Sequence, residues 1–237
     1  GVKHLVELAE ALNAPVVDQL GRMNMPNNHH LYNIGGALIA QADVILGLEP
    51  KTGRPIYDPE KMLKIGKQVT FCPSHWGGKD WPPAAFNPKT RLLYIPLQQN
   101  LCTTLAGEAK IAPYAAGKRY VGTNAAATRV FPREGADHIG EVQAWDLDNN
   151  KLVWTYKFPD MNPNWGPLLA TGGGLVFGGG SADRMFRALD AKTGELKWRA
   201  ALGGQINSAP MTFAVNGRQY VTIAAGSALF AFALPVK

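Results

Sequence analysis

The sequence predicts a mainly β protein, a partial β-propeller of about four blade-like units preceded by a short N-terminal α/β segment. Three observations support this class. A hairpin pattern recurs four times after residue 46, and residues 1–49 follow a different pattern. Glycine and proline are also abundant, at 26 and 17 of 237 residues, and frequent turns are typical of all-β proteins. We therefore expect two domains, an α/β segment over 1–49 and propeller blades over 50–237.

The N-terminal segment alternates helical and extended patterns. Apolar residues first recur at helical spacing, an Asn-Ala-Pro sequence then breaks the helix, and a short buried strand follows. The same order is repeated once, which is typical of a parallel α/β layer. The expected elements are a helix over 5–12, a strand at Val16–Val17, a helix over Gly35–Ala42 and a strand over Asp43–Leu48.

The hairpin pattern has a strand, a tight turn and a second strand that ends in an aromatic residue. The turn residues supply positive φ angles, and the aromatic can pack between neighbouring sheets. A repeat of about forty residues with about four short strands predicts propeller blades, whereas a β-sandwich would not require the turn and the aromatic to recur in phase. The four copies are "GLEPKTGRPIY" from Gly47, "AFNPKTRLLYI" from Ala85, "AWDLDNNKLVW" from Ala144 and "ALDAKTGELKW" from Ala188, with further strands expected over 174–178 and 219–224.

Composition excludes several classes of function. No apolar run reaches eighteen residues, so no transmembrane helix is expected, and no N-terminal secretion signal is expected. The net charge is +6, but the basic residues are scattered, which argues against nucleic-acid binding. The two cysteines, Cys72 and Cys102, lack the spacings of a c-type haem or a cysteine zinc site. A single disulfide between them is still possible, and it would imply an oxidising compartment.

The stretch "HLVELAEALNAPVVDQLGRMNMPNNHHLYNIGGALIAQADVILGLE" ends at Glu49 and resembles part of the central domain of thiamine-diphosphate enzymes of the acetolactate synthase type. The family's catalytic glutamate and cofactor motif lie outside this fragment, so no thiamine chemistry follows from it. The adjacent His29 and His30 suggest a metal site, but adjacent histidines on a polar loop are more often solvated.

The remaining sequence, from about 51 to 235, resembles the C-terminal part of quinoprotein alcohol dehydrogenases. The resemblance is carried by the "AxDxxTGxxxW" repeats, "CPSHWGGKDWPP" (72–83), "ATGGGLVFGGG" (170–180) and "QYVTIAAG" (219–226). It implies part of an eight-bladed ring that holds pyrroloquinoline quinone (PQQ) on its axis beside a calcium or lanthanide ion. It also implies an oxidoreductase that oxidises an alcohol with PQQ as electron acceptor, in the periplasm.

The resemblance also implies site residues. In the family, the loop matching 72–83 places an Asn-Trp pair beside the quinone, and the matching positions here are Asp80 and Trp81. Asp80 departs from the pattern, because a carboxylate cannot donate a hydrogen bond and would repel the quinone unless protonated or paired with Lys79. Trp165 matches a second tryptophan near the cofactor. Packing between blades is the alternative role for both tryptophans. A spaced cysteine pair in the family implies a Cys72–Cys102 disulfide.

Other parts of the family's active site have no match in this sequence. The catalytic base, the metal-ligating Glu and Asn, and the vicinal cysteine pair belong to the family's N-terminal half, so the catalytic and metal-binding residues stay unknown here. Three aspartates on turns or strand ends are instead expected to cap local backbone amides. They are Asp137, Asp146 and Asp183.

Three functions therefore stay open. The first is a PQQ-dependent alcohol dehydrogenase in incomplete form, acting on a small alcohol with a separate electron acceptor, a cytochrome c or a quinone. The second is a non-catalytic propeller module for binding or structure, and the third, least favoured, is a remnant of a thiamine-diphosphate enzyme. Half a ring would expose two flanks with aromatics such as Trp154 and Trp198, so we expect self-association.

Overall fold

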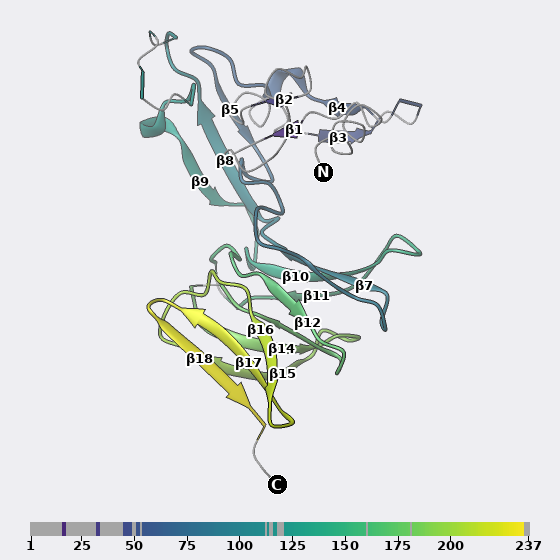
Figure 1. Ribbon diagram of the computed structural model, residues 1–237. Helices are drawn as coiled ribbons and strands as arrows, with labels where there is room; N and C mark the ends of the chain where they lie inside the picture. The colour runs from purple at the N-terminus through teal and green to yellow at the C-terminus, as the bar shows by residue number, and fades with distance from the viewer. Residues whose placement is uncertain are drawn as a thin grey trace. The chain divides into compact units, whose positions relative to one another are not determined.

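In the computed structural model, the regular secondary structure of the described residues is almost entirely β-strand (Figure 1). The structure describes residues 16–17, 32–33, 45–48, 51–52, 54–111, 113, 116–117, 121–159, 161–180 and 182–234. The chain divides into two compact units, one of Gly1–Phe71 with Thr104–Arg129 and one of Cys72–Thr103 with Val130–Lys237. Across the described ranges, no helix is long and apolar enough to cross a membrane.

The first unit contains short strand pairs. β1 (Val16–Val17) pairs in parallel with β2 (Tyr32–Asn33), and β3 (Ile45–Leu48) pairs antiparallel with β4 (Pro55–Tyr57). The strand predicted at 16–17 is confirmed as β1, and the strand predicted over 43–48 contains β3. The two predicted helices and the His29–His30 pair lie outside the described residues, so the boundary after residue 49 stays a prediction.

A three-stranded sheet follows, in the order β5-β8-β9. Its strands are β5 (Gln68–Phe71), β8 (Leu101–Ala106) and β9 (Arg129–Pro132). Burial alternates along β5, where Val69 and Phe71 face inward and pack with Leu105. This alternation is what a strand with one solvated face requires. Two single 3₁₀ turns accompany the sheet, η1 (Pro59–Lys61) and η2 (Ala125–Ala127).

The first four-stranded sheet of the second unit has the order β11-β10-β7-β6. Its strands are β6 (Ala85–Asn87), β7 (Leu92–Leu97), β10 (Glu141–Asp146) and β11 (Lys151–Lys157). The hairpins that begin at Ala85 and Ala144 therefore share one sheet, with residues 98–140 inserted between them. The prediction that each hairpin marks its own blade was wrong here, because a hairpin supplies two strands of a four-stranded blade and its sequence does not reveal the partner strand.

The next two sheets are formed by strands that are consecutive in sequence. One has four strands, β12 (Leu168–Ala170), β13 (Leu175–Gly178), β14 (Met185–Asp190) and β15 (Leu196–Ala201). The other, drawn in yellow tones in Figure 1, has three, β16 (Met211–Val215), β17 (Arg218–Ala225) and β18 (Ala228–Ala233). The strands predicted over 174–178 and 219–224 correspond to β13 and β17. The predicted class, a partial β-propeller, is confirmed.

Apolar layers lie between successive sheets of this unit. The Tyr94 hydroxyl and the Trp154 indole both donate to the Ala191 carbonyl, at 3.0 and 3.2 Å. Gly194 lies under Trp154, where any Cβ would be 2.6 Å from Cε3 of the indole. Two of the hairpin aromatics, Tyr94 and Trp154, thus pack between sheets, as predicted. Trp154 is 9% exposed, so its expected place on an open flank was wrong, because the β12–β15 sheet covers it. Trp198 is 38% exposed.

Candidate functional site

The loop over 72–83 is fixed at several points. The disulfide expected from the family resemblance, Cys72–Cys102, is present and ties the start of the loop to β8. Within the loop, the Gly77 N–H donates to the Ser74 carbonyl at 2.7 Å, and Gly77 has a φ of +76°. The Gly78 carbonyl accepts from the Gln98 N–H at 2.7 Å. A loop held in this way can present its side chains in fixed positions.

The aromatic part of the site is built on Trp76 and Trp165. Their ring centroids lie 5.3 Å apart at 69°, an edge-to-face contact, and the His75 ring centroid lies 5.2 Å from that of Trp76. We call the Trp76–Trp165 pair the tryptophan wall. Trp76 was not predicted as a site residue. The signal that could have found it is a second tryptophan in a loop rich in glycine and proline.

The His75 ring is fixed by a hydrogen bond between its Nδ1 and Thr103 Oγ1, at 2.8 Å. Burial lowers the pKa of the His75 imidazole, and the Asp80 carboxylate opposes part of that shift. A lowered pKa favours a neutral ring near neutral pH, with one nitrogen donating and the other accepting. His75 therefore supports the tryptophan wall without adding a positive charge beside it.

Asp80 and Trp81 lie at the exposed end of the loop. The Asp80 carboxylate accepts a hydrogen bond from the backbone N–H of Trp81 at 2.7 Å. The Lys79 ammonium donates to the backbone carbonyl of Asp80 at 2.7 Å, not to its carboxylate. Trp81 is 56% exposed. Among the described residues, Trp81 makes no ring contact with Trp165, so the structure joins Trp165 to Trp76 rather than to Trp81.

The backbone at Trp165 depends on glycine. The Trp165 N–H donates to the Gly180 carbonyl at 3.3 Å. Gly166 approaches the backbone that follows β13 so closely that a Cβ there would lie 1.4 Å from the Gly179 carbonyl oxygen. No residue with a side chain fits at 166 without moving this backbone. The Trp-Gly dipeptide and the glycines that follow β13 therefore act together to place the Trp165 indole.

A buried polar network supports this backbone from the β10 side. Both ring nitrogens of His138 contact carboxylates, those of Asp137 and Glu141, and Glu141 also accepts from Gln143 at 2.7 Å. The Asn164 side-chain amide donates to the Glu141 carbonyl at 3.2 Å, and its oxygen accepts from the Gly166 N–H at 3.0 Å. Asn164 thus connects the network to the segment that carries Trp165.

The three aspartates expected to cap backbone amides divide into two groups. Asp146 accepts from the N–H groups of Asp148 and Asn149, as predicted. Asp183 accepts from the Met185 N–H and also binds Arg187. Asp137 differs from the prediction, because its carboxylate binds the His138 ring and the Lys157 ammonium. Lys157 and then His138 lower the pKa of Asp137 to about 2.

Neither atom of the Gln98 side-chain amide has a hydrogen-bond partner in the part of the chain that the structure describes. The residue is 1% exposed, and its own N–H binds the loop at Gly78. Buried amides are normally paired, so this one has unused donor and acceptor capacity. Within the same described ranges, no three His, Cys, Asp or Glu side chains gather as metal ligands.

Comparisons with known proteins relate these sheets to a family. Residues 158–221 match the family model described as the β-propeller domain of glucose, ethanol and alcohol dehydrogenases with PQQ. A quinoprotein alcohol dehydrogenase of Pseudomonas putida is 36% identical over 186 residues, which cover 76% of this chain and 28% of that protein. A lanthanide-dependent methanol dehydrogenase of Methylacidiphilum fumariolicum is 37% identical over 182 residues, which again cover 76% of this chain and 28% of that protein.

The structural comparison agrees. The structure of a europium-containing methanol dehydrogenase matches with a TM-score of 0.68 and 34% identity, over 76% of this chain and 31% of that one. The chain thus spans less than a third of the length of these relatives. The comparisons give no support to the thiamine-diphosphate resemblance predicted for residues 1–49. The propeller sheets are therefore similar, in sequence and in fold, to part of the PQQ-dependent alcohol dehydrogenases.

Proposed function

We propose that this chain is part of a PQQ-dependent alcohol dehydrogenase and forms one wall of its quinone site. The observation that carries the proposal is the tryptophan wall. Trp165 lies inside the region that matches the PQQ propeller family, and the disulfide-bonded loop brings Trp76 against it. Flat indole surfaces on fixed backbone are suited to a planar, conjugated ligand.

The described residues fit such a ligand in part. The indoles of Trp76, Trp81 and Trp165 offer ring faces and N–H donors, and the buried Gln98 amide has unused capacity beneath the loop. The Asp80 carboxylate does not fit, because PQQ is itself a polycarboxylate and like charges in a partly buried site repel. We therefore infer that Trp165 and Trp76 bind the ring system and that Trp81 covers its exposed side, while Asp80 weakens binding.

The chemistry that PQQ supplies when bound is acceptance of the two electrons of alcohol oxidation at a polarised carbonyl. The residues of this chain have a different task. The tryptophan wall orients the ring plane and excludes water from one side, and Asn164 and the Gly166 N–H hold the wall in place. A calcium or lanthanide ion would be held by residues beyond those described, since no ligand group gathers among them.

Partners and location follow from the same proposal. The substrate would be a small alcohol, and the electrons would pass to a cytochrome c or a quinone, as the names of two relatives indicate for those proteins. The disulfide fits an oxidising compartment such as the periplasm. We also propose self-association, because the three-stranded β16–β18 sheet carries exposed apolar side chains.

The proposal is tested by titrating the protein with PQQ in the presence of Ca²⁺ or La³⁺ and following tryptophan fluorescence and quinone absorbance. Trp76→Phe and Trp165→Phe should weaken binding, whereas Trp198→Phe, a matched change on β15, should leave it unchanged. Alcohol-dependent reduction of an artificial electron acceptor would be measured on the loaded protein in parallel. Equal affinity in all four proteins would contradict the assignment of the wall to PQQ.

The second candidate function is a propeller module that binds or supports a partner without redox chemistry. One observation favours it, the carboxylate of Asp80 at a position where the family has an amide. The PQQ titration also separates the two candidates, since a module without redox function should not bind the quinone saturably even when Asp80 is replaced by asparagine.

A further inference from the structure

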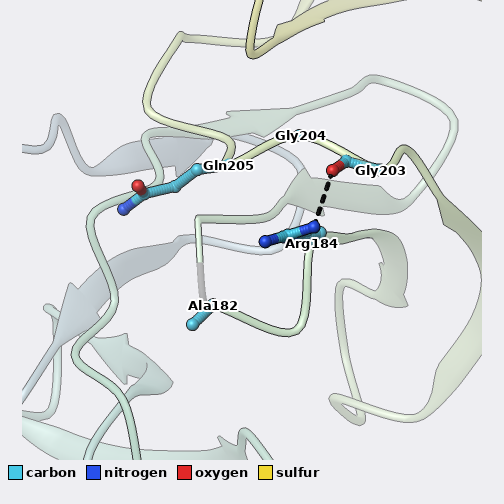
Figure 2. Close-up of a pocket in the computed structure, with 5 residues that line it drawn as sticks. All are labelled: Ala182, Arg184, Gly203, Gly204 and Gln205. Atoms are coloured by element: carbon cyan, nitrogen blue, oxygen red, sulfur yellow. Dashed lines mark hydrogen bonds between the residues drawn. The ribbon is translucent and has the colours of Figure 1, made fainter.

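A cavity of about 260 Å³ opens at one end of the β12–β15 sheet, where two connections meet. The connection from β13 to β14 supplies Ala182 and Arg184, and the connection from β15 to β16 supplies Gly203, Gly204 and Gln205 (Figure 2). None of these residues takes part in the tryptophan wall. The lining includes one cationic residue, Arg184, one amide residue, Gln205, and two glycines.

Arg184 is held in place by both its backbone and its side chain. Its carbonyl accepts from the Leu202 N–H at 3.0 Å, and its guanidinium donates from one terminal nitrogen to the Gly203 carbonyl at 3.1 Å. Figure 2 shows this guanidinium lying beside the Gly203–Gln205 segment, with the bond drawn as a dashed line. The φ angle of Arg184 is +58°, a conformation uncommon for a residue with a side chain.

The opposite side of the cavity is formed by a glycine pair that no other residues could replace without strain. Gly203 has a φ of +72°, and a Cβ on Gly204 would lie 2.7 Å from the Ala225 carbonyl carbon. The carbonyl of Gln205 accepts from the Gly226 N–H at 3.0 Å, which ties the segment to the β17–β18 turn. Small residues therefore leave the backbone accessible on a rigid support.

No acidic side chain among the described residues forms an ion pair with the cation in the cavity. Asp183, beside Arg184 in sequence, directs its carboxylate to the buried Arg187 and to the Met185 N–H. None of the ion pairs in the described ranges involves Arg184. A guanidinium has five N–H donors, so most of those on Arg184 stay available.

We propose that this cavity is a binding site for a small anion, a carboxylate or phosphate group held by the Arg184 guanidinium beside the Gly203–Gln205 backbone. A positioned guanidinium binds two oxygens of such a group at once, which a lysine cannot do with the same geometry. The volume is below that of sites for drug-sized ligands, about 300–1,000 Å³, so the ligand, or the part of it that enters, is small. Two sources carry such a group, a free metabolite and a larger ligand such as a quinone, and the second source rests on the proposed function.

The test uses malonate, inorganic phosphate and PQQ, titrated separately at constant ionic strength and followed by calorimetry. The key variant is Arg184→Gly, which removes the guanidinium and suits the positive φ, so its melting temperature should not fall. Loss of a hydrogen bond to a charged group should weaken binding at least about tenfold. The matched control is Arg199→Gln, because Arg199 is an exposed arginine on β15 outside the cavity. This variant should change the affinity by less than about twofold, because salt screens the interaction between its exposed charge and the anion.

Saturable binding of malonate or phosphate that Arg184→Gly weakens would support a site for free anions. If only PQQ binds and Arg184→Gly weakens it, the site holds a carboxylate of that larger ligand. Trp165→Phe then separates this inference from the proposed function, since this variant should weaken the binding of PQQ and leave the binding of malonate unchanged. Absence of saturable binding by all three compounds, or equal losses in Arg184→Gly and Arg199→Gln, would overturn the inference.

Discussion

The Nε2 atom of His138 lies 2.8 Å from Glu141 Oε2, and both side chains are buried at the start of β10. The second carboxylate oxygen of Glu141 accepts from Gln143, and its backbone carbonyl accepts from Asn164. Glu141 is therefore the residue through which β10 is joined to the backbone that carries Trp165.

Glu141→Ala should destabilise the protein by about 2–4 kcal/mol, because it leaves a histidine nitrogen and the Gln143 amide buried without an acceptor. Urea unfolding measures this change in the free energy of unfolding. Glu195→Ala is the matched control, since Glu195 pairs with Lys197 at the surface and exposed ion pairs contribute about 0–1 kcal/mol. Equal losses in the two variants would show that the network does not stabilise the blade.

Asp80→Asn should tighten PQQ binding. In the proposed site, the substitution removes a negative charge that would face a polycarboxylate and introduces an N–H donor, while an amide oxygen can still accept from the Trp81 N–H. The affinity comes from the same fluorescence titration as above. Asp58→Asn, which changes the same charge at the cap of η1, controls for net charge. Unchanged or weaker binding in Asp80→Asn would remove Asp80 from the cofactor site.

Loss of the Cys72–Cys102 disulfide should lower the free energy of unfolding by roughly 3–4 kcal/mol, the chain-entropy value for a loop of about thirty residues. The double variant Cys72→Ser with Cys102→Ser, compared with the oxidised protein by urea unfolding, gives the difference. Thiol titration of the unreduced protein should find no reactive cysteine. Two titrating thiols would show that the bond does not form in solution.

The acid stability of the fold should depend on Asp137. Its pKa in the folded protein is about 2, below the value near 3.9 of an unfolded aspartate. The unfolded chain then binds more protons between these values, so the stability contributed by Asp137 is complete above about pH 4 and is lost as the pH falls toward 2. Asp137→Asn should flatten stability against pH in this window, and Lys157→Gln should do so in part. A curve that neither variant changes would contradict this role.

Self-association should bury the exposed apolar residues of the three-stranded sheet. The most exposed of these are Met211 at 57%, Val215 at 49% and Leu229 at 74%. Two-fold pairing would cover the same surface on both copies. Light scattering should therefore find a mass above 25.6 kDa, and Leu229→Lys should reduce it. A monomer in dilute solution that binds no dye specific for apolar surface would exclude this assembly.

Local features of the fold could be predicted from the sequence, and long-range ones could not. Each hairpin can be located by its turn, of "DNN" or "KTG" type, and by the aromatic residue at its end. These signals predict the two strands of one hairpin. Nothing in them shows that the hairpin at Ala85 pairs with the one at Ala144 across more than forty residues. For the same reason Trp154 was expected to be exposed, since its burial depends on Ala191 in the next sheet.

The site could be predicted in outline only. The family resemblance predicted Trp81 and Trp165 as site residues. It also predicted that the loop over 72–83 belongs to the site and that Cys72 and Cys102 form a disulfide. The partner of Trp165 is set by the path of the loop through Gly77 and Gly78, which positions Trp76 rather than Trp81 against the ring. The anion cavity had no sequence signal, because it depends on an arginine in a left-handed conformation next to two glycines.

The insertion of residues 98–140 between β7 and β10 has a consequence for how the chain folds. The β12–β15 sheet is completed by neighbours in sequence within Leu168–Ala201, so its loops close at little cost in entropy. The β6-β7-β10-β11 sheet must instead join strands that the insertion separates, which raises its contact order. During synthesis β6 and β7 emerge first but stay an isolated hairpin until β10 appears. The blade that is earlier in the sequence is therefore expected to be completed by slower, non-local pairing, and the later, local meander to form quickly once it emerges.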